Sequence, residues 1–544
     1  MKISRIYSDG MILQRGRKNI IEGLSDAESK VKVCFDSKEY EAKSDDKGHF
    51  AVYLDEKEAG GPYSIEIADS KEQITINDVW FGDVFLLGGQ SNMELPVCRT
   101  LDLYEDFVKD LDYPLIRMFQ LPKDFRFDGP DDSVSEGEWI AARIGMFMEF
   151  SALGFYFAQR KFTQDGVPVG LVHASVGGTH IEAFMSDAQV RKTGAKLRAI
   201  AAKEGRELKC RCLQNDSCKM CYEEVMSKDK DPLYVSGVIK SDIDNMMNWG
   251  ADLDNKDLGL KEEWFSHEWT QDEKKDSLMI DVPNSWINDE LGQIKGSVWV
   301  QTTVDVPREW CDDDVRLYLG TIVDADFTYV NGTLVGNTEY FYPPRRYVIK
   351  KGILKPGKNV ITVRVIVNNN VGEFKKDMPY YLRKGDDYIS LEGKWVARIA
   401  VKKAAVGGMN FFTWHPTALF NKMIYPVRNI SFDSLLFYQG ESNSRYPEDY
   451  EYLMKDMIEE WRSLFGNLPF IFAELPYFRG ETWDEENDDW DRMRISQKKV
   501  ERDVENTAMV PMYDLGQYNE IHTQNKRDVA DRFYEKYLLL KRNM

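Results

Sequence analysis

The chain has 544 residues, well above the roughly 250 to 300 at which single hydrophobic cores stop growing, so we expect several domains. Hydrophobic residues make up 43% of the chain and aromatic residues 12%, a composition that excludes a largely disordered protein. With 91 acidic and 71 basic residues the net charge is −20, which disfavours binding to nucleic acid or to an anionic membrane surface.

The sequence shows no targeting or membrane signal. Residues 1–9 lack the apolar segment of a secretory signal, and no apolar stretch reaches the ~20 residues that cross a bilayer. We therefore expect a cytoplasmic protein without a transmembrane helix. Three of the seven cysteines (Cys34, Cys98 and Cys311) lie far apart in the sequence, which favours reduced thiols over a dense disulfide framework.

The first part of the chain changes from a β pattern to an α/β pattern. Short alternating apolar runs at 30–77 predict a small antiparallel β-sandwich domain over 1–79. From residue 80, apolar strands such as 84–87 and 435–438 alternate with helical patterns, which predicts a parallel α/β sheet. The spacing of apolar residues at 447–465, with Pro at the start and Gly just after the end, predicts a helix on one face of that sheet.

A second β-rich region interrupts the α/β pattern. Residues 264–402 contain several strand patterns and a two-residue Asn331-Gly332 turn signal, and predict an inserted β-sandwich. The α/β domain is then divided into 80–200 and 403–544. The polar segment 201–263 predicts a mostly helical insertion or connector.

Three loops that follow predicted strands could carry chemistry. Ser91 lies in LGGQSNME at 87–94, and a serine there becomes a nucleophile when a nearby base activates it. Small residues in ASVGGT at 174–179 would let backbone N–H groups approach a ligand oxygen, and the Asn443 amide in YQGESN at 438–443 could donate to the same oxygen. Each loop alone could be an ordinary turn, but three at the strand ends of one sheet indicate a shared site.

Three of the six histidines are candidates for the base. His522 lies in a loop between the strand pattern 508–512 and a C-terminal helix, with carboxylates two and eight residues before it. His173 lies within a predicted strand and could be buried and hydrogen-bonded, while His415 could line a pocket. The sequence around these three histidines does not decide which of them is the base.

The sequences of these loops, and their order along the chain, resemble those of the sialate O-acetylesterase family of the SGNH hydrolases, and the resemblance covers nearly the whole chain. The resemblance is carried by the segments 7–15, 59–63, 82–94, 168–183 and 438–443, and by His522 with Lys526. It implies an SGNH-type, flavodoxin-like catalytic domain with a parallel sheet, and a jelly-roll-like module in the inserted region. Aromatic residues of that module could stack on a sugar ring or simply pack within the protein; they are Tyr340, Phe341 and Tyr342.

The resemblance also implies the catalytic roles. Ser91 is expected to attack, with His522 as its base. Glu520 stands where the family usually has aspartate, Asn519 stands where many relatives of the wider superfamily carry the acid, and Thr523 stands where the family usually has proline. The acid is therefore predicted to be Glu520, with Asp514 as the alternative.

The remaining site residues are predicted as oxyanion donors and substrate contacts. The donors are expected to be the backbone N–H groups of Ser91 and Gly178 and the amide of Asn443. We expect five side chains to contact the substrate: Gln90, Glu182, Gln439, Glu441 and His415.

The predicted activity is removal of O-acetyl groups from a carbohydrate, without a catalytic cofactor. An acetylated sialic acid is the first substrate candidate, and acetylated xylan or mannan oligosaccharides are the alternative. A rival of another class is a carbohydrate-binding protein with a vestigial esterase site. No coiled-coil heptad or interface pattern indicates an oligomeric state.

Four cysteines in the predicted helical insertion form the last candidate site, a possible metal site. Two pairs lie within twelve residues and could bind a structural zinc ion, with reduced surface thiols as the alternative; they are Cys210, Cys212, Cys218 and Cys221. Nothing about them suggests a catalytic role.

Overall fold

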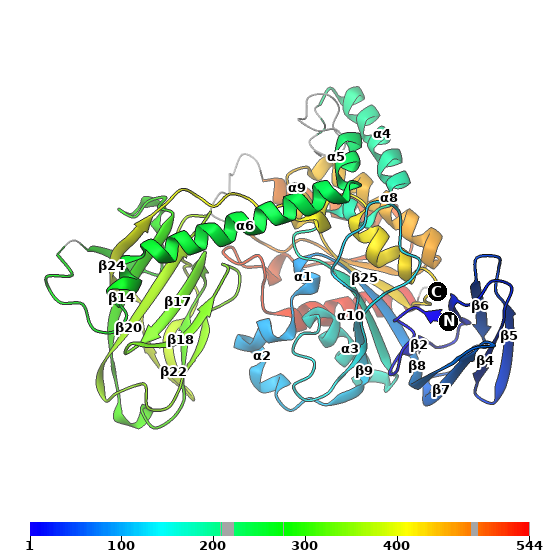
Figure 1. The fold of residues 1–544 in the computed structure, drawn as a ribbon, viewed down its shortest axis with the longest axis horizontal. Helices are drawn as coiled ribbons and strands as arrows, with labels where there is room; N and C mark the ends of the chain where they lie inside the picture. Colours follow the sequence, from blue (N-terminus) through cyan, green and yellow to red (C-terminus); the bar gives the residue numbers. More distant parts are fainter. Residues whose placement is uncertain (207, 209–221, 276, 480–487, 543–544) are drawn as a thin grey trace. The chain divides into compact units, whose positions relative to one another are not determined.

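The computed structural model describes residues 1–544 except 207, 209–221, 276, 480–487 and 543–544. The chain forms two compact units, residues 1–232 with 411–544 and residues 233–410 (Figure 1). Among the described residues, no helix is both long and apolar enough to cross a lipid bilayer.

A parallel sheet is the centre of the first unit. Its strands run in the order β10-β9-β11-β8-β25-β26-β27, and all of them except β10 are parallel to their neighbours. The bounds are β8 (Gln73–Gly89), β9 (Tyr113–Gln120), β10 (Trp139–Ala142), β11 (Val169–Ser175), β25 (Ser434–Tyr438), β26 (Phe470–Ala473) and β27 (Thr507–Val510). Residues 84–87 of β8 are fully buried, as expected for a parallel strand that is covered on both faces.

Helices cover both faces of this sheet. Phe85 of β8 packs against aromatic rings of α3 and α10, while Gly88, three residues on and therefore on the other face, lies against Trp461 of α8. α8 occupies the predicted range 447–465 and packs against α4 and α9. The helices are α1 (Ser91–Glu94), α2 (Leu101–Val108), α3 (Ala152–Asp165), α4 (Asp187–Glu204), α5 (Tyr222–Asp229), α8 (Pro447–Phe465), α9 (Asp489–Asp503) and α10 (Lys526–Arg542).

The N-terminal β-region shares a strand with the parallel sheet. β8 pairs with β7 through its first half and with β11 and β25 through its second half. The boundary predicted between residues 79 and 80 is therefore inside a strand, because one continuous strand takes the place of a linker. The other strands here are β1 (Lys2–Ile3), β2 (Ile12–Gln14), β3 (Asn19–Leu24), β4 (Lys30–Phe35), β5 (Lys38–Lys43), β6 (His49–Leu54) and β7 (Gly60–Ala68).

The second unit begins with helices and continues as a stack of antiparallel sheets. The helices α6 (Pro232–Lys256) and α7 (Leu258–Lys261) fall mostly in this unit, so it begins before the predicted boundary at residue 264. One sheet has the order β12-β24-β14-β20-β17-β18 and another the order β19-β15-β22-β23. Asn331 and Gly332, with φ of 49° and 83°, form the turn between β17 and β18, as their sequence predicts.

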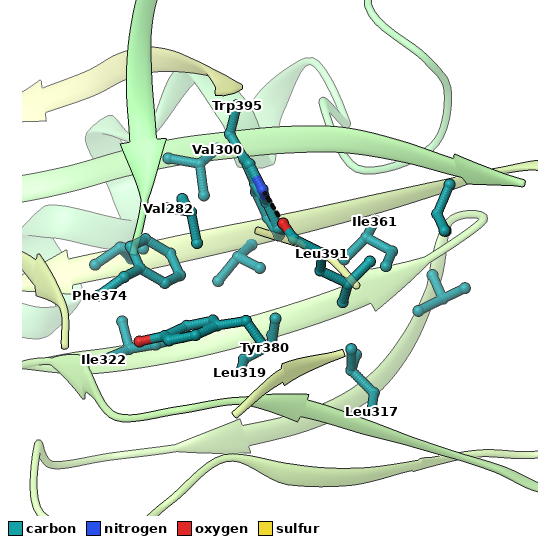
Figure 2. Packing of buried hydrophobic residues seen from close by; sticks show 14 of the residues in the cluster. Val282, Val300, Leu317, Leu319, Ile322, Ile361, Phe374, Tyr380, Leu391 and Trp395 are labelled. Carbon is teal, nitrogen blue, oxygen red and sulfur yellow. Dashed lines mark hydrogen bonds between the residues drawn. The ribbon is translucent and has the colours of Figure 1, made fainter. Parts of the chain in front are cut away.

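The strands of the second unit enclose an apolar core. Figure 2 shows side chains from several strands packed together, with Trp395 donating its indole N–H to the Leu391 carbonyl over 2.9 Å. The strands are β12 (Leu278–Val282), β13 (Asn284–Ser285), β14 (Gly296–Val306), β15 (Val315–Leu319), β16 (Ile322–Val323), β17 (Ala325–Val330), β18 (Thr333–Thr338), β19 (Arg346–Ile349), β20 (Gly357–Val367), β21 (Glu373–Phe374), β22 (Tyr380–Lys384), β23 (Asp387–Ser390) and β24 (Gly393–Lys402).

Gly89, the last residue of β8, allows a close approach to β25. Its φ is +129°, and a Cβ at this position would lie 2.1 Å from the Tyr438 carbonyl oxygen. We predict that Gly89→Ala lowers the free energy of unfolding by about 3 kcal/mol or more, because backbone strain and a backbone clash combine. Denaturant unfolding measures this loss.

Gly166→Ala is the matched control for Gly89→Ala. Gly166 also has a positive φ, +70°, but a Cβ there meets no atom within 4 Å. Its substitution should cost about 1 to 2 kcal/mol, from the left-handed conformation alone. Equal losses in the two variants would contradict the close approach of the strands.

Candidate active site

Three loops meet at the carboxyl ends of neighbouring strands of the parallel sheet. β8 pairs with β11 on one side and with β25 on the other, so the segments after these strands leave the sheet at one edge. Backbone hydrogen bonds join them: the Gln90 N–H donates to the Tyr438 carbonyl over 2.9 Å, and the Val176 N–H donates to the Gly89 carbonyl over 3.2 Å. The topology thus brings the serine, glycine and asparagine segments side by side.

His522 is the histidine that the fold brings to Ser91. Its Nε2 atom lies 2.8 Å from Ser91 Oγ, within hydrogen-bond distance. Ser91 begins α1 directly after β8, whereas His522 comes from the loop between β27 and α10. His522 is 8% exposed, so most of its ring is shielded from water.

The two alternative histidines are bonded to other residues. His173 is buried inside β11 with its Nε2 against the Ser175 hydroxyl, and burial lowers the pKa of His173 to about 3. His415 has its Nδ1 2.8 Å from Asp229 Oδ2. The geometry therefore favours His522 as the base.

The two candidate acids lie in different surroundings. Glu520 is buried, and its Oε1 accepts the backbone N–H of His522 over 2.7 Å and lies 3.9 Å from His522 Nδ1. Asp514 is two-thirds exposed and forms an ion pair of 2.6 Å with Arg532 of α10, which lowers the pKa of Asp514. Of the two, Glu520 is the carboxylate beside the histidine.

Asn92 connects the serine helix to the histidine loop. Its side-chain nitrogen donates to the Ile521 carbonyl over 2.9 Å and to Glu441 over 2.7 Å, and its oxygen accepts from Lys526 Nζ over 2.7 Å. Burial lowers the pKa of Lys526 to about 7 and raises the pKa of Glu441. No sequence pattern predicts this role for Asn92, and the one available signal is its position directly after Ser91.

The Asn443 amide is hydrogen-bonded through both its nitrogen and its oxygen in this structure, and its predicted role as an oxyanion donor stays a prediction. Its amide nitrogen donates to Glu182 Oε2 and to the Tyr446 hydroxyl, each over 2.9 Å, so both amide hydrogens are used. Its oxygen accepts the Ile181 N–H over 3.0 Å. Asn443 therefore fastens its own loop to the segment after β11.

Four of the five predicted substrate contacts are buried in this structure, and their contact with a substrate stays a prediction. Each is at most 7% exposed; they are Gln90, Glu182, Gln439 and Glu441. The Gln90 side-chain oxygen accepts the Ser442 N–H over 3.2 Å, and the Gln439 amide donates to the Thr179 carbonyl over 3.2 Å. These side chains hold the loops to one another, and the fifth, His415, keeps 30% of its side chain exposed.

Two backbone donors remain available at the site. Within the part of the chain that the structure describes, neither the Ser91 nor the Gly178 N–H donates to a protein acceptor. A Cβ built on Gly177 would lie 3.5 Å from Ser91 Cβ, so the glycine loop is in contact with the serine. Two backbone N–H groups beside a hydroxyl and an imidazole can stabilise an oxyanion.

The model of one protein family matches the two segments that build this site. This family is described as carbohydrate esterase, sialic acid-specific acetylesterase, and its model matches residues 81–212 and 390–538. The chain belongs to this family. The matched segments contain Ser91, Gly178, Asn443, Glu520 and His522.

Curated relatives in this acetylesterase family match over a limited range. The sialate O-acetylesterase of Homo sapiens is 28% identical over 153 residues, which cover 26% of this chain and 29% of the human protein. The sialate O-acetylesterase of Rattus norvegicus is 30% identical over 153 residues, which cover 26% of this chain and 28% of the rat protein. The chain thus aligns with less than a third of the length of these relatives.

A solved acetylesterase structure shares the fold over nearly all of this chain. It is a carbohydrate acetylesterase from Xanthomonas citri, with a TM-score of 0.54 and 20% sequence identity. The match covers 98% of this chain and 74% of that protein. The chain therefore has a carbohydrate-acetylesterase-like fold of mixed α/β type with several sheets.

The predicted zinc ligands lie outside the described residues. Cys210, Cys212, Cys218 and Cys221 fall in the range 209–221, so their zinc site stays a prediction. Within the described residues, no group of three or more His, Cys, Asp or Glu side chains could hold a metal ion.

The buried neutral His173 makes stability depend on pH. Its folded-state pKa is about 3, whereas an unfolded histidine titrates near 6.5, so only the unfolded chain takes up this proton between those values. The contribution is complete above pH 6.5 and is lost as the pH falls. At pH 5 the loss is about 2 kcal/mol.

We therefore predict that the wild type loses about 2 kcal/mol more stability between pH 7 and pH 5 than His173→Gln, which cannot titrate. Urea unfolding at the two pH values measures the difference. Parallel losses in the two proteins would show that His173 does not stay neutral in the folded state.

Proposed function

We propose that the protein is a serine esterase that removes O-acetyl groups from carbohydrates. The observation that carries the proposal is the 2.8 Å contact between Ser91 Oγ and His522 Nε2, within segments matched by a carbohydrate esterase family. A serine hydroxyl in contact with an imidazole is the arrangement that generates an oxygen nucleophile at neutral pH.

In the proposed mechanism, Ser91 Oγ attacks the acetyl carbonyl carbon while His522 Nε2 takes the hydroxyl proton. The N–H groups of Ser91 and Gly178 bind the oxyanion, each donor supplying roughly 2.7 to 4 kcal/mol of transition-state stabilisation. His522 then gives its proton to the departing sugar oxygen. A water molecule, deprotonated by His522, attacks the carbonyl carbon of the acetyl-enzyme. The bond from that carbon to Ser91 Oγ then breaks, His522 returns the proton to Oγ, and acetate is released.

Glu520 is the proposed acid of the triad. Its carboxylate would hold the imidazole tautomer whose free nitrogen faces Ser91 and would stabilise the imidazolium that forms. The 3.9 Å separation from Nδ1 is longer than a hydrogen bond, and catalytic hydrogen bonds often shorten when substrate binds.

The finer assignment of the fold is also part of the proposal. The unit with the parallel sheet is proposed as an SGNH-type, flavodoxin-like catalytic domain that is joined to an N-terminal β-sandwich. The site at the carboxyl ends of β8, β11 and β25 supports this assignment. Residues 233–410 are proposed to contain a jelly-roll-like module, supported by their stacked antiparallel sheets.

The proposed substrate is an acetylated sialic acid, and the name of the family and of its curated relatives supports this choice. Acetylated xylan or mannan oligosaccharides remain the alternative, because the same chemistry serves any sugar acetate. The two substrate classes are distinguished by incubating the protein with each and measuring acetate release as a loss of substrate mass. A protein that binds either sugar but releases no acetate would instead be a carbohydrate-binding protein with a vestigial site.

We predict that Ser91→Ala lowers kcat for acetate release by roughly 10⁴-fold or more, because the nucleophile is lost. Ser64→Ala, at an exposed position of β7, is the control and should keep wild-type activity. Release of 4-nitrophenol from its acetate ester measures both. Activity of Ser91→Ala within a few-fold of the wild type would refute the mechanism.

We predict that Glu520→Gln and Asp514→Asn have very different effects on turnover. Loss of the orienting carboxylate cost about 10⁴-fold in a serine protease, so Glu520→Gln should be strongly impaired. Asp514→Asn should stay within a few-fold of the wild type, because it only weakens an exposed ion pair with Arg532. An impaired Asp514→Asn beside a nearly normal Glu520→Gln would reverse the assignment.

A further inference from the structure

The peptide between Gly177 and Gly178 needs an external restraint. Two adjacent glycines have wide conformational freedom, so the peptide plane between them can flip at little cost. Gly178 has a φ of +75°, which few other residues tolerate. The direction of the Gly178 N–H therefore depends on what the neighbouring groups bind.

Trp414 supplies a contact to this peptide. Its indole N–H donates to the Gly177 carbonyl over 2.7 Å. In a trans peptide the carbonyl of one residue and the N–H of the next point in opposite directions. A donor fixed on the Gly177 carbonyl therefore turns the Gly178 N–H away from Trp414, and it also polarises that N–H as a donor.

The peptides on either side are held as well. The Gly177 N–H donates to the Glu94 carboxylate, and the Ser442 hydroxyl donates to the Gly178 carbonyl over 2.8 Å. These bonds use the Gly177 N–H and the Gly178 carbonyl, and within the described residues the Gly178 N–H between them donates to no protein acceptor.

The indole ring is itself fixed against the loop. A Cβ on Gly178 would lie 2.2 Å from Trp414 Cζ2, so the ring rests directly on the glycine. The other neighbour is Phe411, which stacks on Trp414 with ring centroids 4.2 Å apart. The Trp414 backbone N–H donates to the Phe411 carbonyl over 2.9 Å.

We propose that Trp414 is a positioning residue for the oxyanion site: its indole N–H orients the Gly177–Gly178 peptide so that the Gly178 N–H faces the oxygen that becomes negative. This inference rests on the proposed esterase function. It assigns a role to a side chain 237 residues distant from the loop in sequence.

Trp414→Phe tests this role, because it keeps an aromatic ring and removes the N–H. We expect kcat for acetate release to fall roughly 10- to 100-fold with KM changed less than threefold, below the 10²- to 10³-fold cost of losing an oxyanion donor outright. Inhibition by a trifluoromethyl ketone, whose adduct with Ser91 carries a negative oxygen, should weaken in parallel, while binding of the deacetylated sugar should not change.

Trp139→Phe is the matched control. Its indole N–H also donates to a backbone carbonyl, that of Ile6 over 2.8 Å, but Trp139 lies in β10, which β9 and β11 separate from β8. It should keep wild-type kcat. Where Trp414→Phe does not fold, Trp414→benzothienylalanine keeps the shape of the indole and also lacks the N–H.

The outcomes separate the two proposals. Unchanged kcat in Trp414→Phe, or a rise in KM alone, would overturn the positioning role even if Ser91→Ala is inactive. Full activity of Ser91→Ala would instead overturn the proposed function itself.

Discussion

The pairing of β8 with strands on both of its sides is the constraint on which the candidate site depends. Ser91 follows the carboxyl end of β8, and β8 is held between β11, which ends at Ser175, and β25, which begins only at Ser434. Gly88 and Gly89 let β8 lie close to Phe437 and Tyr438 of β25. Without this close approach, the Gln90 N–H could not reach the Tyr438 carbonyl, and the loops would not share one edge.

Buried polar side chains then join the loops to each other. Burying such groups is unfavourable unless each finds a partner, so they form a specific network. Asn443 bonds to the segment after β11, Gln90 to the loop after β25, and Asn92 to the histidine loop. The network fixes positions that no single loop could hold, and this explains why so many of these side chains face inward.

Local patterns predicted the elements, and the topology supplied the contacts. Pro447 and Gly466 mark the ends of α8, and Asn331-Gly332 marks a hairpin, because these signals depend on a few neighbouring residues. The buried roles of Glu182 and Glu441 could not be predicted in this way. A charged residue in a loop normally faces solvent, and its burial depends on partners such as Asn443 and Asn92 that lie about 260 and 349 residues away.

The same reasoning explains why the acid was harder to predict than the serine or the histidine. Glu520 and Asp514 both precede His522 in one loop, and sequence distance does not say which carboxylate turns inward. Arg532 of α10 holds Asp514 at the surface, whereas Glu520 accepts the backbone N–H of His522 itself. The longer glutamate side chain can reach back to that N–H and still lie beside the imidazole, so one carboxylate both shapes the loop and stands next to the ring that contacts Ser91.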